Sequence, residues 1–198
     1  MKIIRRPRPH TFAKGTALTI GNFDGVHLGH QAILHRVNEV ARQQDLSSCV
    51  MTFTPHPRAF FAQRGQRPEL IPTQISGLRD KVEALHQCGI EQIYLARFNQ
   101  AMADMSAATF IDEILVQGLN TGWLLVGEDF RYGHKRAGDI EMLREAGKRH
   151  GFSVETLHDV ADADGPRLLC HRDDGIRWSQ VRCRTIRIGS NAVLSTPG

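Results

Sequence analysis

The residues with the clearest chemical meaning form one turn, Gly21 to His30, whose sequence is GNFDGVHLGH. An apolar run over 17–20 precedes the turn, and a helical pattern over 28–43 follows it. This order places unpaired backbone N–H groups and the positive end of a helix dipole at the turn, where phosphate is bound favourably. His27 and His30 stand at this helix start. Both can donate hydrogen bonds to phosphate oxygens and, when protonated, can offset charge that develops during transfer.

A second candidate site follows the apolar run over 49–53, where the sequence reads Thr52-Phe53-Thr54-Pro55-His56-Pro57. The prolines hold the chain extended as it leaves the strand. Such a segment alone is also typical of a rigid loop that binds nothing. The stretch beyond it, 58–72, carries Phe60, Phe61, Arg64 and Arg67. A loop of this length is either a lid or binding loop or a disordered surface loop, and the residues leave both interpretations open.

The third candidate is the run Gly127-Glu128-Asp129-Phe130-Arg131-Tyr132-Gly133, which continues to Asp139. A glycine directly after a buried strand lets the backbone approach a ligand closely. Asp129 and Arg131 would then face the ligand, and Lys135 and Arg136 lie near enough to attract phosphate. Taken without the other two segments, the same residues favour a charged surface turn.

Short apolar runs alternate with helical patterns along the chain. Strands are expected at 17–20, 49–53, 93–95, 123–126 and 152–157. Helices are expected at 28–43, 75–87, 107–117 and 140–150, with Gly89 and Gly151 as C-cap residues. The alternation predicts an α/β fold with a parallel sheet flanked by helices. Because ligands of such sheets bind beyond the carboxyl ends of the strands, the loops 21–30, 54–74 and 127–139 should converge on one crevice.

The composition is that of an ordinary globular domain, with 198 residues of which 41% are hydrophobic and 23% charged. No apolar stretch approaches the ~20 residues of a membrane span, and the basic N-terminus lacks the apolar core of a secretory signal. The cysteines have neither metal-ligand spacing nor the pattern of a disulfide framework; they are Cys49, Cys88, Cys170 and Cys183. We therefore expect a reduced, cytoplasmic protein without a membrane partner.

The net charge of +4 does not indicate a nucleic-acid partner. Residues 177–198 contain four arginines and no acidic residue. Without these four, the 25 basic residues fall to 21 and equal the 21 acidic ones. The excess positive charge therefore belongs to the C-terminal segment, and the rest of the chain is expected to have no basic face for nucleic acid.

Together the three segments resemble the N-terminal adenylyltransferase module of the prokaryotic bifunctional riboflavin kinase/FMN adenylyltransferase family. GNFDGVHLGH, TFTPHP, Leu78-Arg79-Asp80-Lys81 and GEDFRYGHKRAGD follow one another in that family's order and spacing, over residues 15 to 177. The HxGH element is shared with nucleotidyltransferases that use other acceptors, whereas TFTPHP and GEDFRYG are similar to the flavin enzymes alone. The resemblance implies a Rossmann-like nucleotidyltransferase fold for residues 1–176.

The resemblance also implies a reaction, the transfer of AMP from ATP to FMN with Mg²⁺, which yields FAD and pyrophosphate. The FMN phosphate would attack the α-phosphorus directly, so that no protein nucleophile is required. Positioning and electrostatic stabilisation carry such chemistry. The implied partners are the small molecules ATP and FMN.

Matching residue by residue, the resemblance implies catalytic roles for His27 and His30. The implied ATP-binding residues are Gly21, Asn22, Phe23, Asp24, Gly25, His27, Gly29, His30, Gly127, Arg177 and Ser179. The implied flavin-binding residues are Pro55, His56, Pro57, Asp129, Phe130 and Arg131. Asp129, where the family carries Asn or Asp, is also the implied metal ligand.

The match ends in the segment that, in the family, opens a helix with an arginine, an apolar residue and three small hydroxyl residues. Arg177 and Ser179 fit this pattern, but Gln180 and Val181 do not. The change is either a genuinely divergent terminus or a shift of reading frame near codon 178. We expect residues 177–198 to form a divergent, disordered tail that weakens the reaction, and no riboflavin kinase domain in the chain.

Two other functions stay open on the sequence alone. The altered segment around Gln180 would suit a non-catalytic remnant that binds ATP or a flavin nucleotide without turnover. The HxGH element would also suit a nucleotidyltransferase with another phosphate acceptor, against which TFTPHP argues.

Overall fold

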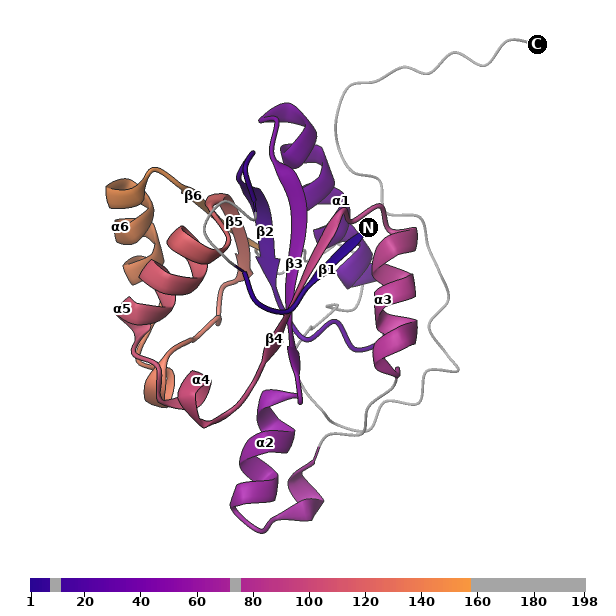
Figure 1. Ribbon diagram of the computed structural model, residues 1–198, viewed down its shortest axis with the longest axis vertical. Coiled ribbons are helices and arrows are strands. Elements are labelled where there is room, and N and C mark those ends of the chain that lie inside the picture. Colours follow the sequence, from indigo (N-terminus) through magenta and orange to yellow (C-terminus); the bar gives the residue numbers. More distant parts are fainter. Residues whose placement is uncertain (8–11, 72–75, 158–198) are drawn as a thin grey trace, which may run out of the picture.

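Six parallel strands build the sheet of this protein, whose computed structural model describes residues 1–7, 12–71 and 76–157 (Figure 1). The strands lie in the order β1-β4-β3-β2-β5-β6. Their bounds are β1 Lys2–Ile4, β2 Thr16–Ile20, β3 Ser47–Thr54, β4 Gln92–Arg97, β5 Thr121–Gly127 and β6 Ser153–Leu157. Every recorded pairing between these six strands is parallel, which confirms the α/β fold predicted from the alternation of elements.

Helices cover both faces of this sheet (Figure 1). The helices α1 (Leu28–Gln43) and α3 (Leu78–Gln87) pack on one face, where Leu34, Val37 and Leu85 meet the strands. On the other face α5 (Ala107–Thr109) continues into the wider helix η2 (Phe110–Gly118), and α6 (Ile140–His150) lies beside it. Alternate residues of the central strands serve the two faces, which explains why β2 is buried along its whole length.

Four shorter elements connect these layers. They are α2 (Pro57–Arg64), η1 (Pro68–Leu70), α4 (Gln100–Asp104) and η3 (His134–Arg136). Figure 1 shows α2 projecting from the end of β3, away from the body of the sheet. Within the described residues no helix is long and apolar enough to cross a lipid bilayer.

The predicted elements are confirmed with changed bounds, and five elements were not predicted, two of which are the short helices η1 and η3. The predicted strands and helices correspond to β2 through β6 and to α1, α3, the α5–η2 helix and α6. Gly89 and Gly151 follow their helices with φ of +81° and +80°, as expected of C-cap residues. The sequence reading missed β1, α2 and α4. The boundary and the disorder predicted for the tail, 177–198, lie outside the described residues.

The strand order reverses direction at β2, and this reversal determines where the loops lie. From β2 the chain moves outward through β3 to β4, then returns to place β5 on the opposite side of β2. The loops after β2 and β5 therefore leave their strands toward opposite faces of the sheet, and the carboxyl ends at such a reversal are where open parallel sheets bind ligands. The two segments GNFDGVHLGH and GEDFRYG follow these two strands.

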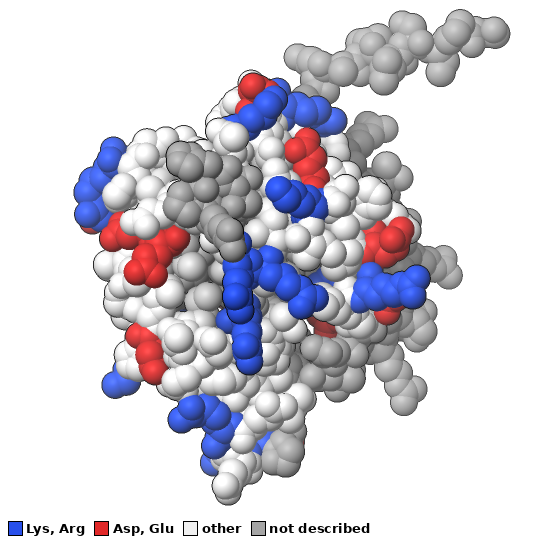
Figure 2. Space-filling view, in the orientation of Figure 1, with Lys and Arg blue, Asp and Glu red and all other residues white. Residues whose placement is uncertain are grey.

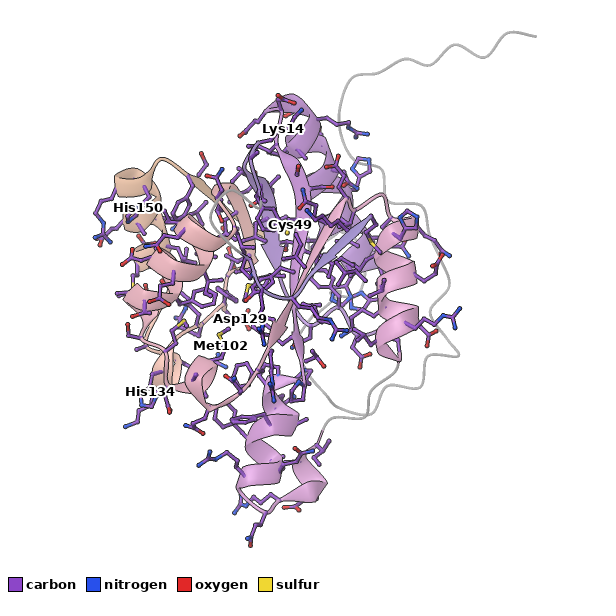
Figure 3. All side chains as sticks on the ribbon, in the orientation of Figure 1. Lys14, Cys49, Met102, Asp129, His134 and His150 are labelled. Atoms are coloured by element: carbon purple, nitrogen blue, oxygen red, sulfur yellow. The ribbon has the colours of Figure 1, made fainter. Side chains whose placement is uncertain are left out.

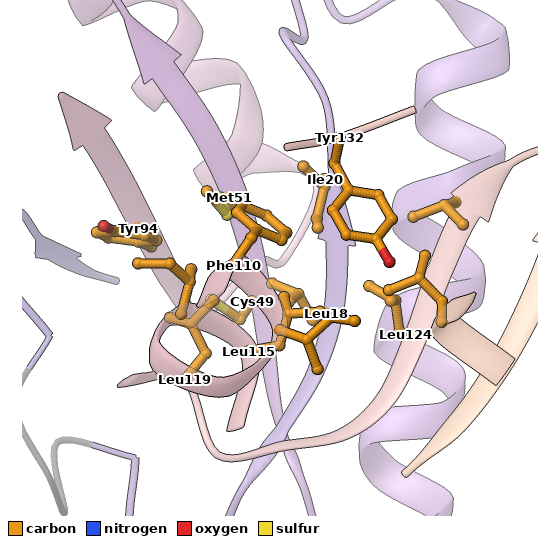
Figure 4. Packing of buried hydrophobic residues seen from close by; sticks show 14 of the residues in the cluster. Leu18, Ile20, Cys49, Met51, Tyr94, Phe110, Leu115, Leu119, Leu124 and Tyr132 are labelled. Carbon is orange, nitrogen blue, oxygen red and sulfur yellow. The ribbon is translucent and has the colours of Figure 1, made fainter. Parts of the chain in front are cut away.

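The loop after β5 is anchored by Tyr132, whose ring is buried against Phe110 at 5.2 Å between centroids. Figure 4 shows this ring between Ile20 and Leu124 in the core. Tyr132 and Gly138 exchange both backbone hydrogen bonds, which closes the loop into a small hairpin. A Cβ atom on Gly138 would lie 2.5 Å from Cζ of Tyr132, so that only glycine fits at this position.

We predict that Gly138→Ala destabilises the protein by about 1–3 kcal/mol, because the added methyl group overpacks a buried ring. Urea unfolding of the two proteins measures the loss. In a Tyr132→Leu background the clashing ring atoms are gone, so the same substitution should cost much less. Equal losses in both backgrounds would show that the ring is not what excludes a side chain at Gly138.

Candidate active site

The turn between β2 and α1 is held by Phe23. Its side chain is 2% exposed and packs in the core with residues of α1 and the sheet. The residue adopts a φ of +47°, and a Cβ atom on Gly21 would lie 2.9 Å from Cε2 of its ring. Gly21 is therefore required by the packing of Phe23. Any contact of Phe23 with a ligand must come from its backbone, because the ring faces inward.

His27 and His30 lie against each other at the start of α1, as the sequence predicts. Their rings stack with centroids 3.8 Å apart and planes 24° apart. His27 is the N-cap residue of α1, and its Nδ1 accepts a hydrogen bond from the backbone N–H of His30 at 3.4 Å. The Nδ1 of His30 lies 3.4 Å from the carbonyl oxygen of Gly25. The sequence therefore correctly places both histidines at one helix start, with the first capping the helix.

Because of these contacts, the Nε2 atoms of the two neutral imidazoles differ in whether they donate or accept a hydrogen bond. Nδ1 of His27 accepts, so its proton lies on Nε2, which can donate to an anion. Nδ1 of His30 must carry a proton to bond the Gly25 carbonyl, so its Nε2 is an acceptor. His30 can donate to an anion from Nε2 only when it takes up a second proton.

Both histidines are neutral near pH 7 in this structure. Burial lowers the pKa of His27 below its ordinary value. Burial also lowers the pKa of His30 to about 4, with further lowering by the charges of His27 and Lys81 and an opposing contribution from the Gly25 carbonyl. A phosphate group beside His30 would raise this pKa again, because an anion favours the charged imidazole. Binding of an anion here is thus coupled to proton uptake.

Asp24 connects the histidine turn to a segment 52 residues further along the chain. Its Oδ1 accepts hydrogen bonds from the backbone N–H and the hydroxyl of Ser76, both at 3.0 Å. The backbone N–H of Gly25 donates to the Ser76 hydroxyl at 3.2 Å. The sequence analysis did not predict that Ser76 contributes to this turn. Its only local signal is a small hydroxyl residue directly before the helical pattern of α3.

Pro55, His56 and Pro57 form the start of α2 rather than a loop without secondary structure. His56 is the N-cap residue, and its Nδ1 accepts from the backbone N–H of Arg58 at 3.0 Å. Pro57 takes the first helical position, where a missing N–H costs nothing. Burial lowers the pKa of His56, and the charges of Lys81 and Arg58 lower it further. Residues 72–75 of the predicted loop lie outside the described residues.

Four phenylalanines meet beside this helix start. Phe98, after β4, lies 5.4 Å from Phe60, 5.7 Å from Phe61 and 5.8 Å from Phe53, measured between ring centroids. The rings meet edge to face, and Phe61 is 55% exposed. We call this group the phenylalanine cluster. The sequence indicated Phe60 and Phe61, but not Phe53 and Phe98, whose participation depends on the pairing of β3 with β4.

The loop after β5 carries the exposed carboxylate of Asp129 and the stacked rings of Phe130 and Tyr132. Gly127 is the last residue of β5, and Asp129, which is labelled in Figure 3, is exposed just beyond it. Phe130 stacks on Tyr132 with centroids 5.7 Å apart, so this side chain supports the loop. Lys135 and Arg136 are exposed in η3. Figure 2 shows Lys and Arg together with Asp and Glu on the face in view, so neither sign of charge covers it alone.

A groove of about 430 Å³ lies at the ends of β5 and β6, next to the start of α6. Arginine and acidic side chains line it, among them Glu128, Arg131, Asp139, Glu141 and Arg144. The histidines do not contribute to this groove. It adds a second concave surface to the crevice predicted at the strand ends.

The predicted site residues fall on two sides of β2. The histidine turn follows β2 itself, Pro55–Pro57 follow β3 on one side, and Asp129–Arg131 follow β5 on the other. Two strand spacings separate β3 from β5, roughly 10 Å. The residues expected to bind flavin therefore come from loops on both sides of β2. Arg177 and Ser179 lie outside the described residues.

The carboxylates of the described residues fit a Mg²⁺ site that is completed by the phosphates of a substrate. This ion is usually bound by one or two carboxylates together with phosphate oxygens of a substrate. No group of three or more His, Cys, Asp or Glu side chains that could hold a metal occurs in the described part of the chain. An exposed carboxylate such as Asp129 fits the substrate-dependent manner and not a metal site built by protein alone.

Comparison with known proteins identifies relatives of this chain. A protein-family model described as FAD synthetase matches residues 10–167. The chain is 43% identical over 155 residues to the bifunctional riboflavin kinase/FMN adenylyltransferase of Pseudomonas fluorescens, which covers 78% of this chain and 48% of the relative. The chain is also 40% identical over 182 residues to the protein of the same name from Escherichia coli K12. This match covers 92% of this chain and 53% of the relative. The chain thus spans about half the length of these curated relatives.

A solved structure with a similar fold supports the fold assignment. It is the crystal structure of a protein named macrolide-efflux protein from Streptococcus pneumoniae, with a TM-score of 0.65 and 25% sequence identity. The match covers 83% of this chain and 53% of that one. Together with the all-parallel sheet, this likeness confirms the predicted Rossmann-like fold.

We predict that the protein loses stability as the pH falls from about 6.5 to 4. In this interval the unfolded chain binds a proton at His30 that the folded protein, with a pKa of about 4, does not. The contribution is fully present above pH 6.5 and amounts to up to about 3 kcal/mol, since one pKa unit corresponds to about 1.4 kcal/mol.

Urea unfolding of the wild type and of His30→Gln between pH 7 and 4 tests this prediction. Glutamine cannot be protonated, so the variant should lose less stability than the wild type over the same interval. Parallel loss in both proteins would show that His30 is not protonated preferentially in the unfolded chain.

Proposed function

This chain belongs to the FAD synthetase family, and we propose that it transfers the AMP group of ATP to FMN to form FAD and pyrophosphate. The observation that carries the proposal is the position of the stacked histidines. They lie at the start of α1, beside the strand where the sheet order reverses. This is the place at which an open parallel sheet binds nucleotides.

The reaction needs orientation of two phosphates more than it needs a reactive side chain. An oxygen of the FMN phosphate attacks the α-phosphorus of ATP, and a new P–O bond forms. The bond from the α-phosphorus to the oxygen that bridges it to the β-phosphorus breaks, and pyrophosphate leaves with that electron pair. Negative charge grows on the leaving oxygens, so catalysis consists of positioning and charge stabilisation.

The two histidines have separate parts in this proposal. His27 donates from Nε2 in its neutral form, together with the backbone N–H groups at the start of α1. His30 takes up a proton as the polyphosphate binds and then donates from Nε2 as a cation. Two donors that face the same phosphates offset the charge that develops on the leaving group.

The substrates are proposed to lie across the end of β2. The phenylalanine cluster at α2 suits the flat isoalloxazine ring, because aromatic faces stack on one another and Phe61 is exposed there. The FMN phosphate then reaches the histidine turn past Pro55–Pro57. The groove beside α6, with Arg131 and Arg144, lies on the opposite side and suits the nucleoside end of ATP. Asp129 would hold Mg²⁺, which supplies further neutralisation of the phosphates when bound.

We further propose a reduced cytoplasmic location and small-molecule partners only. Cys49 and Cys88 are both free thiols, and burial raises the pKa of Cys49 to about 12, which makes it unreactive. The lowered rate expected from Gln180 and Val181 concerns residues outside the described part of the chain and stays a prediction.

We predict that His30→Ala lowers the rate of FAD formation by about 10²-fold or more, because it removes a preorganised donor to the phosphates. FAD production from ATP and FMN measures the rate. The matched control is His35→Ala, since His35 is an exposed histidine on the same helix. A near-normal rate for His30→Ala would remove this residue from the mechanism. An equal fall in the control would indicate damage to α1.

We predict that Phe61→Ala raises the KM for FMN about tenfold and leaves the affinity for ATP unchanged, since a base-sized ring loses about 1–3 kcal/mol without its stacking partner. Steady-state kinetics with each substrate varied measures both. Leu70→Ala is the control, because Leu70 is equally exposed at 55% but lies outside the phenylalanine cluster. If the affinity for ATP falls and the KM for FMN does not rise, the proposed isoalloxazine site lies on the wrong side of β2.

A further inference from the structure

Lys81 is a buried lysine that has no role in the proposed reaction as described above. It lies in the first turns of α3 and is only 9% exposed, whereas the other lysines of the described chain are exposed. Placing an ammonium group in a protein interior costs free energy unless a partner compensates. A lysine in this position therefore requires an explanation.

The described structure records neither an ion pair nor a side-chain hydrogen bond for Lys81. Burial lowers its pKa, and the negative charge of Asp24 opposes that lowering. Asp24 uses Oδ1 to hold the backbone and hydroxyl of Ser76. The carboxylate thus provides a favourable field without forming an ion pair with the ammonium. This leaves the three donors of the ammonium for another acceptor.

The charge of Lys81 acts on both the histidine turn and the start of α2. It lowers the pKa of His30 in the histidine turn and of His56 at the start of α2. The start of α3 is fixed against the histidine turn, since Ser76 bonds both Asp24 and the N–H of Gly25. Figure 1 shows α3 on the same face of the sheet as α1. Lys81 is therefore positioned by contacts that do not depend on a ligand.

We propose that the ammonium group of Lys81 binds the phosphate of the acceptor FMN and so distinguishes FMN from riboflavin, an inference that rests on the proposed function. The charge of Lys81 acts on both His56 and His30, so a phosphate bound between these two histidines would lie in the field of the ammonium. The two negative charges of the phosphate would supply the partner that the buried ammonium lacks. Riboflavin has the same ring system and side chain but no phosphate, so it gains nothing from this contact.

The test compares binding of FMN and riboflavin to the full chain by quenching of flavin fluorescence. We expect Lys81→Met to weaken FMN binding at least tenfold and to leave riboflavin binding unchanged, since a charged hydrogen bond is lost with little change in volume. The control is Lys148→Met, because Lys148 is exposed in the last turn of α6, away from the proposed site. It should leave both affinities as they are.

Urea unfolding of the same variants separates this role from a structural one. Lys81→Met should be at least as stable as the wild type near pH 7, because it removes a buried charge that has no ion-pair partner in the described structure. A variant that loses stability and binds both flavins equally poorly would show a structural lysine and overturn the proposal. Unchanged FMN binding would overturn it as well.

Two further outcomes distinguish this inference from the reaction itself. If the wild type binds FMN but forms no FAD with ATP, adenylyl transfer is wrong, and the FMN-to-riboflavin ratio of Lys81→Met still decides the role of Lys81. If Lys81→Met weakens ATP binding and leaves FMN binding intact, Lys81 contacts the nucleotide donor and the proposal falls. A wild type that binds no FMN overturns both.

Discussion

The reversal of strand order at β2 is the constraint on which the site depends. In a parallel sheet all carboxyl ends lie along one edge, and loops of successive strands normally leave toward the same face. Because β5 lies on the other side of β2 from β3, the loops after β2 and β5 separate. The crevice between them needs no special loop conformation. It follows from the order of the strands, and the histidine turn and Asp129 come to its two borders for the same reason.

Within this crevice the local packing decides the electrostatics. Phe23 is buried and holds the turn, which places His30 partly inside the protein. Burial there disfavours a charged imidazole, so the ligand-free site is less positive than two histidines beside a helix start suggest. The charge returns when an anion binds. This arrangement limits repulsion between two stacked imidazoles 3.8 Å apart and supplies positive charge only with the ligand.

Asp24 and Ser76 make α3 part of the same unit. Their hydrogen bonds join the turn after β2 to the start of a helix that lies far along the chain. This helix carries Lys81, whose charge acts on His30 and His56. On the β3 side of β2, Phe98 joins the phenylalanines of α2 to the end of β4. The proposed acceptor site is therefore built from four separate segments, each carried by a different strand or helix of one rigid sheet.

Local sequence determined the elements of this protein and the identity of its central motif. Apolar runs and helical periodicity depend on neighbouring residues, so they located β2 through β6 and the main helices, and GNFDGVHLGH indicated the phosphate site. A local signal for α2 was also present, because a histidine N-cap followed by proline suits a helix start, but the prolines favoured a loop instead. The three residues of β1 are too few for a periodic pattern to be visible.

Only the tertiary structure decided which residues meet. The strand order, the bond from Asp24 to Ser76, the contact of Phe98 with Phe60 and the burial of Lys81 all join residues that are far apart in sequence. Hydrophobic periodicity predicts which face of its own helix or strand a residue occupies. It does not predict which other helix or strand packs against that face. The neutral state of His30 likewise depends on how completely the fold removes it from water, which is a property of packing and not of the motif.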